Sequence, residues 1–255
     1  MGTSTSLPGL LREPDWKDVK RMGRRWAQGT VDTPIFADEC IETLRRQIAA
    51  NGDDFGLQRA MLDAGRRLVN ILDALGREGL KAVVDLEDVA PEEREERFVR
   101  AVADQVAYPG VLPADSAARW AAVQSAQQIL NEPEVKRTVR AADLSSGLVS
   151  DDMFCEVYRF FFGAVLAGFL TTAFTAKIIV AAPVLLSLPA GAGTVLAKWM
   201  ADRAMDAILS PCAKQVEPGN EKRPLAELGR DLLAESVRRV LGIGGETHPA
   251  LGAAA

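Results

Sequence analysis

Residues 160–197 read FFFGAVLAGFLTTAFTAKIIVAAPVLLSLPAGAGTVLA, and Lys177 carries the only formal charge in these 38 positions. Arg159 and Lys198 border the stretch. Its first part, from Phe160 to Ala182, is long enough to cross the hydrocarbon core of a bilayer, which takes about 20 apolar residues. A helix that is apolar on every side lies in a membrane or at the centre of a bundle. The stretch therefore predicts a buried or membrane-inserted helix.

Small and large side chains form two stripes along this helix. Small residues recur every four positions and form one stripe, which consists of Ala164, Gly168 and Thr172. Large residues form the opposite stripe, which consists of Phe162, Leu166, Leu170 and Phe174. A small-residue face lets a second helix approach closely, as is common in membranes. We expect these residues, with Lys177, to mediate helix packing or membrane contact. The small stripe could also join two copies of the chain.

The second part of the stretch allows two geometries. In one, Lys177 marks the tip of a hairpin of two short spans. In the other, one helix runs to Ala182, and a loop rich in Pro and Gly leads back into a helix at Thr194. Pro183 and Pro189 fit a loop better than a span, because proline lacks the amide proton that a helix needs. This favours the second geometry.

The rest of the chain predicts amphipathic helices and no strand alternation. We expect helices at about residues 14–27, 38–51, 55–75, 194–209 and 225–241, with others starting at Pro91, at Asp115 or Ser116, and at Pro133. The fold class that follows is all-α: a multi-helix bundle with a central, fully apolar helix or helical hairpin. We divide it into an amphipathic region (1–150), the apolar segment with its return helix (151–210), and a polar loop, last helix and tail (211–255).

Composition excludes several classes of function. The chain has 255 residues, a formal charge of −5, and 48% hydrophobic and 25% charged residues, as expected for a globular protein. A net negative charge argues against a nucleic-acid partner. His248 is the only histidine, so histidine-rich metal sites are excluded and a histidine general base nearly so. With no nucleotide-binding motif either, we expect no cofactor and no enzymatic activity.

The cysteines and the N-terminus predict a compartment. Cys40, Cys155 and Cys212 are odd in number and far apart, so we expect reduced thiols rather than a disulfide framework or a zinc site. A secretory signal is not evident at the N-terminus. We expect the protein in the cytoplasm, at or inserting into the inner face of the membrane.

The first helix combines tryptophan with a basic face. Such a helix suits a membrane interface, where rings lie at headgroup level and cations meet anionic lipid. The candidate interfacial residues are Trp16, Lys20, Arg24, Arg25, Trp26 and, in the later helix, Trp199. The alternative is a surface helix that its tryptophans dock onto the bundle, with solvated basic side chains.

An acidic cluster precedes the apolar stretch. The pattern Asp151-Asp152-x-x-x-Glu156 resembles the metal-binding motif of terpene cyclases, and carboxylates can hold magnesium. However, the second motif of that family is not evident. Capping is the simpler role, because Asp151 or Asp152 places negative charge at the start of the long helix.

We therefore expect a non-enzymatic, membrane-associating helical protein. In organisation, though not in any motif, it resembles the colicin-type pore-forming domains, in which a hydrophobic hairpin hides inside a helical bundle until insertion. The resemblance implies a conditional membrane-inserting or pore-forming effector whose partner is a lipid membrane. One alternative is a soluble scaffold or partner-binding protein with the apolar helix as its core. A remote alternative is a magnesium enzyme using the acidic cluster.

Overall fold

The structure, a computed structural model, describes residues 13–53, 55–107, 110, 112–143, 147–174 and 192–243. Within these ranges the chain is helical and contains no strand, which confirms the all-α bundle. The elements in order are α1 (Glu13–Ala27), α2 (Thr33–Asn51), α3 (Leu57–Arg77), a 3-10 turn (Leu80–Ala82), α4 (Arg94–Val106), α5 (Pro113–Asn131), α6 (Pro133–Ala141), α7 (Asp151–Phe174), α8 (Ala192–Ala207), α9 (Pro211–Gln215) and α10 (Leu225–Leu241).

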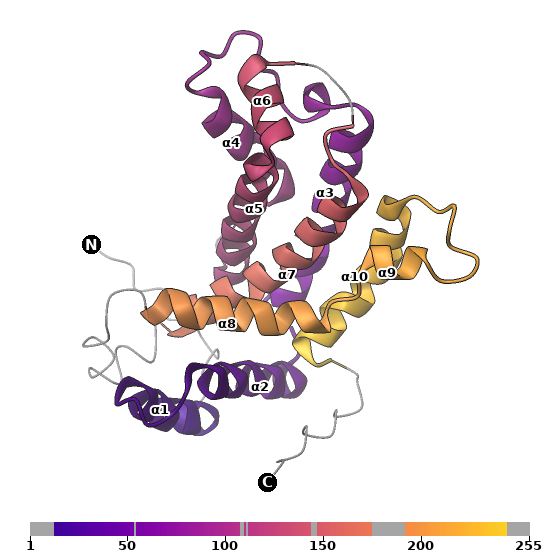
Figure 1. Ribbon diagram of the computed structural model, residues 1–255. Helices are drawn as coiled ribbons and strands as arrows, with labels where there is room; N and C mark the ends of the chain where they lie inside the picture. Colours follow the sequence, from indigo (N-terminus) through magenta and orange to yellow (C-terminus); the bar gives the residue numbers. More distant parts are fainter. Residues whose placement is uncertain are drawn as a thin grey trace.

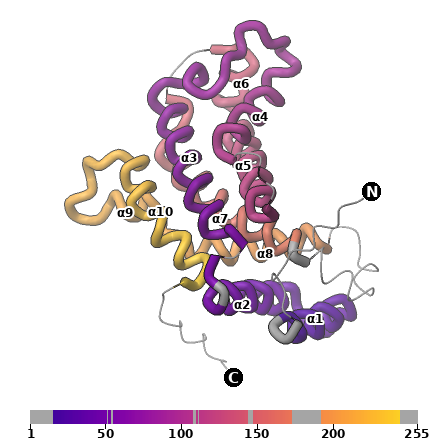
Figure 2. Tube along the Cα trace, turned by 180° about the vertical axis from the view of Figure 1, so that it is seen from behind, coloured from indigo at the N-terminus to yellow at the C-terminus, as the bar shows by residue number. Residues whose placement is uncertain are grey.

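Helix α7 lies at the centre of the bundle (Figure 1). It contacts α3, α5, α8, α9 and α10, so helices from both halves of the chain surround it. The opposite view shows α2 and α1 beyond α8, away from α3 and α5 (Figure 2). The central apolar helix that the sequence predicts is therefore confirmed.

Local sequence accounts for most helix ends. Proline occupies the first turn of α2, α5 and α6, where its missing amide proton costs no intrahelical bond. Gly52 and Gly242, with φ of 66° and 67°, end α2 and α10 in a conformation that favours glycine. The expected end of α2 and both ends of α10 are confirmed.

Three helix starts differ from expectation. Helix α2 begins at Thr33 rather than Asp38, because Pro34 starts the helix instead of breaking it. Helix α4 begins at Arg94, after a turn that follows Pro91. In α5 the carboxylate of Asp115 accepts a bond from the amide of Leu112 at 3.2 Å, so the helix starts two residues before Asp115.

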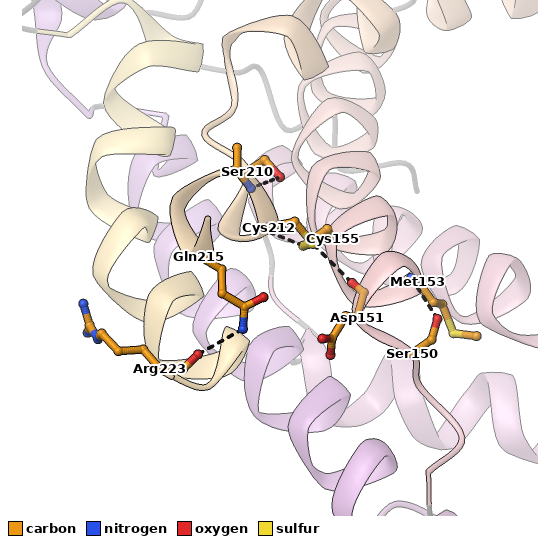
Figure 3. The surroundings of a disulfide bond; sticks show 9 residues. Ser150, Asp151, Met153, Cys155, Ser210, Cys212, Gln215 and Arg223 are labelled. Carbon is orange, nitrogen blue, oxygen red and sulfur yellow. Dashed lines mark hydrogen bonds between the residues drawn. A yellow bond between two sulfur atoms is a disulfide. The ribbon is translucent and has the colours of Figure 1, made fainter. Parts of the chain in front are cut away.

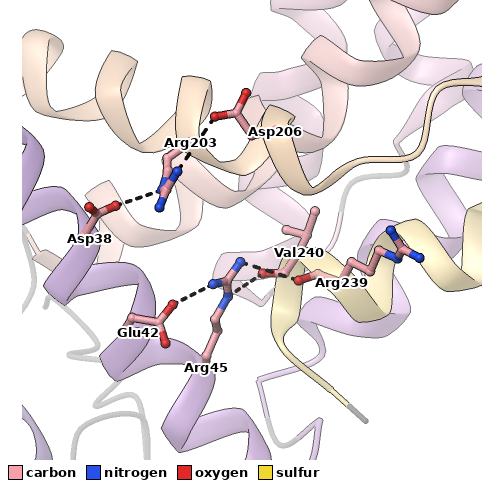
Figure 4. Close-up of polar contacts among 7 residues, drawn as sticks. All are labelled: Asp38, Glu42, Arg45, Arg203, Asp206, Arg239 and Val240. Carbon is pink, nitrogen blue, oxygen red and sulfur yellow. Dashed lines mark hydrogen bonds and ion pairs between the residues drawn. The ribbon is translucent and has the colours of Figure 1, made fainter. Parts of the chain in front are cut away.

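Polar contacts fix α2 against α8 and α10 (Figure 4). Nε of Arg45 donates to the carbonyl oxygen of Val240 at 3.1 Å, and Nη1 of Arg45 contacts Glu42 at 2.6 Å. Arg203 of α8 pairs with Asp38 of α2 at 3.1 Å. A cation at the last carbonyls of a helix compensates their partial negative charge. Arg45 therefore closes the end of α10 from a distant part of the sequence.

Candidate membrane-interaction region

The predicted packing residues of α7 lie mostly inside the bundle. Phe162, Ala164, Leu166 and Leu170 are each at most 2% exposed, so the large stripe is buried up to Leu170 and the small stripe is buried at Ala164. Thr172 is exposed. Phe174 is the last residue of α7, and its side chain lies outside the described residues, as does Lys177. The choice between a single helix and a hairpin beyond Phe174 therefore falls outside the described part of the chain.

Gly163 is the point of closest approach between α7 and α8. A Cβ placed on Gly163 would lie 2.7 Å from the carbonyl oxygen of Ala201 and 2.8 Å from Cγ of Met205. Both distances are too short for non-bonded atoms, so the two backbones meet here because position 163 has no side chain. Gly163 admits a second helix, and that helix is α8 of the same chain.

Gly168 faces a different helix, α5. A Cβ on Gly168 would lie 3.1 Å from Cε3 of Trp120 and 3.6 Å from Cβ of Ala117. Trp120 is 45% exposed, and its ring lies against Gly168. One turn further on, the hydroxyl of Thr172 donates to the carbonyl oxygen of Gly168 at 2.9 Å. Gly163 and Gly168 thus contact two separate helices, α8 and α5.

Aromatic rings fill the space between α7, α3 and α10. The Phe162 ring packs edge-on against Tyr158, with centroids 5.1 Å apart, and its tip would be 2.7 Å from a Cβ on Gly65. The buried Tyr158 hydroxyl donates to the carbonyl oxygen of Gly229 at 3.3 Å. This bond satisfies a polar group that would be costly to bury alone. Phe162 therefore acts as a core residue in this conformation.

Arg159, at the edge of the uncharged stretch, reaches across to α8. Its Nη2 donates to the carbonyl oxygen of Met205, in the last turn of α8, at 3.1 Å. Its Nε is buried with no hydrogen-bond partner among the described residues. An unsatisfied donor on a charged group lowers the stability of the buried arrangement. In the sequence Arg159 only borders the uncharged stretch, because nothing local indicates its partner.

Exposed apolar side chains gather where α8 begins beside α2. Val195 and Trp199 of α8 are 50% and 45% exposed, and Ile35 of α2 is 55% exposed. Trp199 shares a shallow groove with Pro34 and with carboxylates of both helices. In that groove Arg203 also approaches Asp206, at 4.0 Å (Figure 4). Trp199, a candidate interfacial residue, thus lies in an exposed surface that also carries negative charge.

The tryptophans of α1 are not placed as expected for a membrane interface. Trp16 is 2% exposed, and Trp26 is half-buried, donating from Nε1 to Thr33 Oγ1 at 3.0 Å. Instead, the tryptophans dock α1 onto α2, which is the alternative that the sequence also allows. Arg24 and Arg25 are exposed, and Lys20 is half-buried. The interfacial assignment of Trp16 is wrong for this conformation, because its apolar face is buried against the bundle.

Cys155 and Cys212 form a disulfide, so the expectation of three reduced thiols is wrong (Figure 3). The bond joins α7 to α9, and 57 positions separate the two cysteines. Cys40 is a buried free cysteine. Spacing in the sequence could not reveal this pair, since its two members meet only when the return helix α8 packs along α7. The one available signal is that the two cysteines flank the uncharged stretch.

The acidic cluster does not assemble a metal site. No group of three potential ligands comes together within the described ranges. Asp151 and Asp152 are exposed in the first turn of α7, and Glu156 accepts a bond from Gln128 at 2.6 Å. The capping oxygen is that of Ser150, which accepts from the amide of Met153 at 3.2 Å. The expected cap is thus displaced by one residue, and the carboxylates complement the helix dipole.

Helix α7 is the one described helix that is long and apolar enough to cross a membrane. The most apolar 18 residues of the qualifying part, Asp151–Thr172, have a mean hydropathy of 1.5, and 72% of those residues are buried. The core helix of a soluble protein meets the same criterion. No family model matches the chain, and neither the curated proteins nor the solved structures include a significant match.

Proposed function

We propose that this protein is a non-enzymatic helical bundle that associates conditionally with a lipid membrane. In this proposal the bundle opens, and α7 and the uncharged sequence after it move from protein core into bilayer. The observation that carries the proposal is that α7 bears no charged side chain from Phe160 onward and that the sequence continues without charge, except Lys177, to Ala197. Insertion or a pore would follow at the inner face of the cytoplasmic membrane.

The energetics allow such an exchange. Apolar side chains leave water in a bilayer as they do in a protein core, so the burial of residues such as Phe162 and Leu166 is kept. The run from Phe160 to Ala182 spans about 34 Å as a helix, against roughly 30 Å of hydrocarbon. Opening the bundle would also release the buried Nε of Arg159 toward water or headgroups. The main cost is the packing that α7 loses.

Exposed residues near the end of α7 and the start of α8 support the insertion of this part of the chain into a bilayer. Thr172, Val195 and Trp199 are already exposed. Tryptophan is favoured at membrane interfaces because its ring is apolar and its indole N–H is polar. When α8 leaves α7, the backbone around Gly163 would become available to a second copy of the chain. A homo-oligomer through this face is therefore part of the proposal.

One substitution tests membrane insertion without changing the stability of the bundle. Thr172 is exposed in the bundle and lies near the middle of residues 160–182. Thr172→Arg should leave the melting temperature unchanged, yet an arginine at a helix centre opposes insertion by about 2.5–3.5 kcal/mol. We expect flotation of the full chain with liposomes containing anionic lipid to fall at least about tenfold, with dye release falling in parallel.

The matched control is Ala213→Arg, an equally exposed position on α9 outside the uncharged stretch. It should float as the wild type does. Wild-type protein that stays in the soluble fraction and releases no dye contradicts the proposal. So does Thr172→Arg protein that floats as well as Ala213→Arg protein.

A second candidate is a soluble scaffold or partner-binding protein with α7 as its core. The enclosure of α7 by the helices around it favours this function. It predicts a monodisperse species without detergent, one cooperative thermal transition and no flotation. It also predicts that Gly168→Leu destabilises the fold by about 1–3 kcal/mol through overpacking against Trp120. An unchanged melting temperature for that variant would count against it.

A further inference from the structure

The disulfide closes a loop that contains α8 and most of α7. Cys155 lies in the second turn of α7, and Cys212 lies at the start of α9, just beyond α8. Every described residue of α8 therefore falls between the two bonded cysteines. The bond is the covalent part of the attachment between α8 and α7.

Non-covalent packing completes that attachment, since Leu196, Met200 and Ala204 of α8 are buried in the bundle. The backbone of Ala201 lies against Gly163, and Arg159 donates to the carbonyl oxygen of Met205 near the end of α8. On its other side, α8 is partly exposed, and Arg203 reaches α2 through an exposed ion pair with Asp38. Exposed ion pairs contribute little to stability, whereas the disulfide is a covalent fixed point just beyond the end of α8.

The two sulfur atoms differ in their surroundings (Figure 3). Cys155 is 7% exposed, whereas Cys212 is half-buried. The backbone amide of Cys212 donates to Sγ of Cys155 at 3.0 Å, while Sγ of Cys212 lies 3.4 Å from the carbonyl oxygen of Asp151. A hydrogen bond to a sulfur stabilises it as a thiolate, and a carbonyl oxygen does not. Cys155 is therefore the better leaving group, and Cys212 is the more accessible sulfur.

We propose that Cys155–Cys212 is a thiol–disulfide exchange site for a dithiol reductant, and that its reduction frees α8 from α7. A reductant thiolate attacks Sγ of Cys212, the bond between the cysteines breaks, and Cys155 leaves as a thiolate. The second thiol of the reductant then attacks the mixed disulfide. The products are two protein thiols and one oxidised reductant, so two electrons and two protons pass to the protein. Intracellular disulfides are commonly of this transient, redox-sensing kind.

The consequence for membranes rests on the proposed function. Reduction would make departure of α8 more frequent and would uncover the Gly163 face of α7. The oxidised protein would then be the closed form and the reduced protein the form competent to insert. Because α8 can be released without any membrane being present, the two proposals can be tested separately.

Trapping with glutathione tests the site of attack. Oxidised full-length protein is incubated with reduced glutathione, quenched with acid, digested and examined by mass spectrometry. We expect the adduct on Cys212, in clear excess over Cys155, with Cys40 unmodified. An adduct mainly on Cys155 would overturn the assignment of attacked and leaving sulfurs. Purified protein in which Cys155 and Cys212 do not form a bond under oxidising conditions would overturn the whole proposal.

Hydrogen–deuterium exchange tests the release of α8. Reduction by dithiothreitol should accelerate amide exchange in α8 by at least about tenfold and make α8 exchange before α3 and α5, because local opening needs only the loss of nearby contacts. The double variant Cys155→Ser/Cys212→Ser should exchange fast with or without reductant. Cys40→Ala is the matched control and should respond to reductant as the wild type does. Equal α8 exchange in the oxidised and reduced wild type contradicts the release.

Flotation of the oxidised and reduced wild-type protein then separates the two proposals. Release of α8 without flotation supports the exchange site and contradicts the membrane function. Flotation that is equal in both redox states supports the membrane function and contradicts the role of the disulfide in controlling it.

Discussion

Gly163 and Ala201 bring the backbones of α7 and α8 into direct contact, since a Cβ on Gly163 would lie 2.7 Å from the Ala201 carbonyl oxygen. Backbone atoms cannot move aside as the end of a side chain can. The contact therefore sets the distance between two helices that belong to different ends of the uncharged stretch. It also makes position 163 a sensitive test of the fold.

Gly163→Ala should destabilise the protein, because the added methyl forces α8 away from α7. Overpacking of this kind costs about 1–3 kcal/mol, measured as the free energy of unfolding in urea. Gly193→Ala is the matched control, since Gly193 lies exposed at the start of α8 with no atom within 4 Å of its added Cβ. Equal stabilities of the two variants would show that α8 does not pack against α7 in this way.

Arg45→Met should weaken the attachment of α10 to α2. It removes the bonds from Arg45 to the carbonyl oxygens of Val240 and Arg239, at 3.1 and 3.4 Å, while keeping much of the aliphatic stem. We expect a loss of about 1–3 kcal/mol in urea unfolding, the range for hydrogen bonds of charged groups. Arg66→Met, which removes only an exposed pair with Asp63 at 3.8 Å, should change stability by less than about 0.5 kcal/mol. Similar losses in both variants would contradict the special role of Arg45.

Loss of the Cys155–Cys212 bond should lower the free energy of unfolding. For a closed loop of this length, the chain-entropy model gives about 4 kcal/mol, because the unfolded chain regains freedom when the bond is absent. The measurement compares urea unfolding of the oxidised wild type with Cys155→Ser/Cys212→Ser. Reduced wild type provides the control and should match the double variant. A double variant as stable as the oxidised wild type would exclude a bond in the native protein.

Cys40 predicts a loss of stability at alkaline pH. Burial, and secondarily the carboxylate of Glu39, raise the pKa of this thiol well above its ordinary value of 9.0. Below the ordinary pKa of 9.0 the thiol is protonated in both the folded and the unfolded protein, so it contributes nothing to the pH dependence of stability. Above it the unfolded thiol ionises while the folded one stays protonated, so stability falls as pH rises.

Cys40→Ala should therefore reduce the drop in unfolding free energy between about pH 7 and about pH 10. The Cys155–Cys212 bond is kept oxidised, so that Cys40 is the one thiol that titrates. Equal drops in the wild type and the variant would mean that Cys40 is not buried. In the folded wild type, iodoacetamide should also modify Cys40 slowly compared with the unfolded chain.

Much of the fold could be predicted because it depends on local pattern. The ends of α10 follow from the preceding Pro224 and the terminating Gly242, and the burial of Phe162 and Leu166 follows from a helix with no polar face. Predictions failed where the partner mattered. The spacing of Cys155 and Cys212 predicts reduced thiols, yet the two form a disulfide, because α7 and α9 meet in the packed bundle.

The candidate membrane-interaction region also combines features that the sequence indicates with features that depend on how the helices pack. The sequence alone indicates that a glycine such as Gly163 allows close approach of a helix, but it does not say which helix. The partner of Arg159 and the docking of Trp16 were equally out of reach, because each depends on how two helices cross. Crossing angles arise from the packing of whole helix surfaces, and no short sequence pattern encodes them.

The amino-acid sequence by itself determined that this protein is helical and that an uncharged helix must be removed from water, because periodicity and hydrophobicity act locally along the chain. Only the tertiary structure decided that α8 covers that helix, that Arg45 closes α10, and that Cys155 meets Cys212. These are contacts between residues far apart in the chain, and they exist only once the helices have packed.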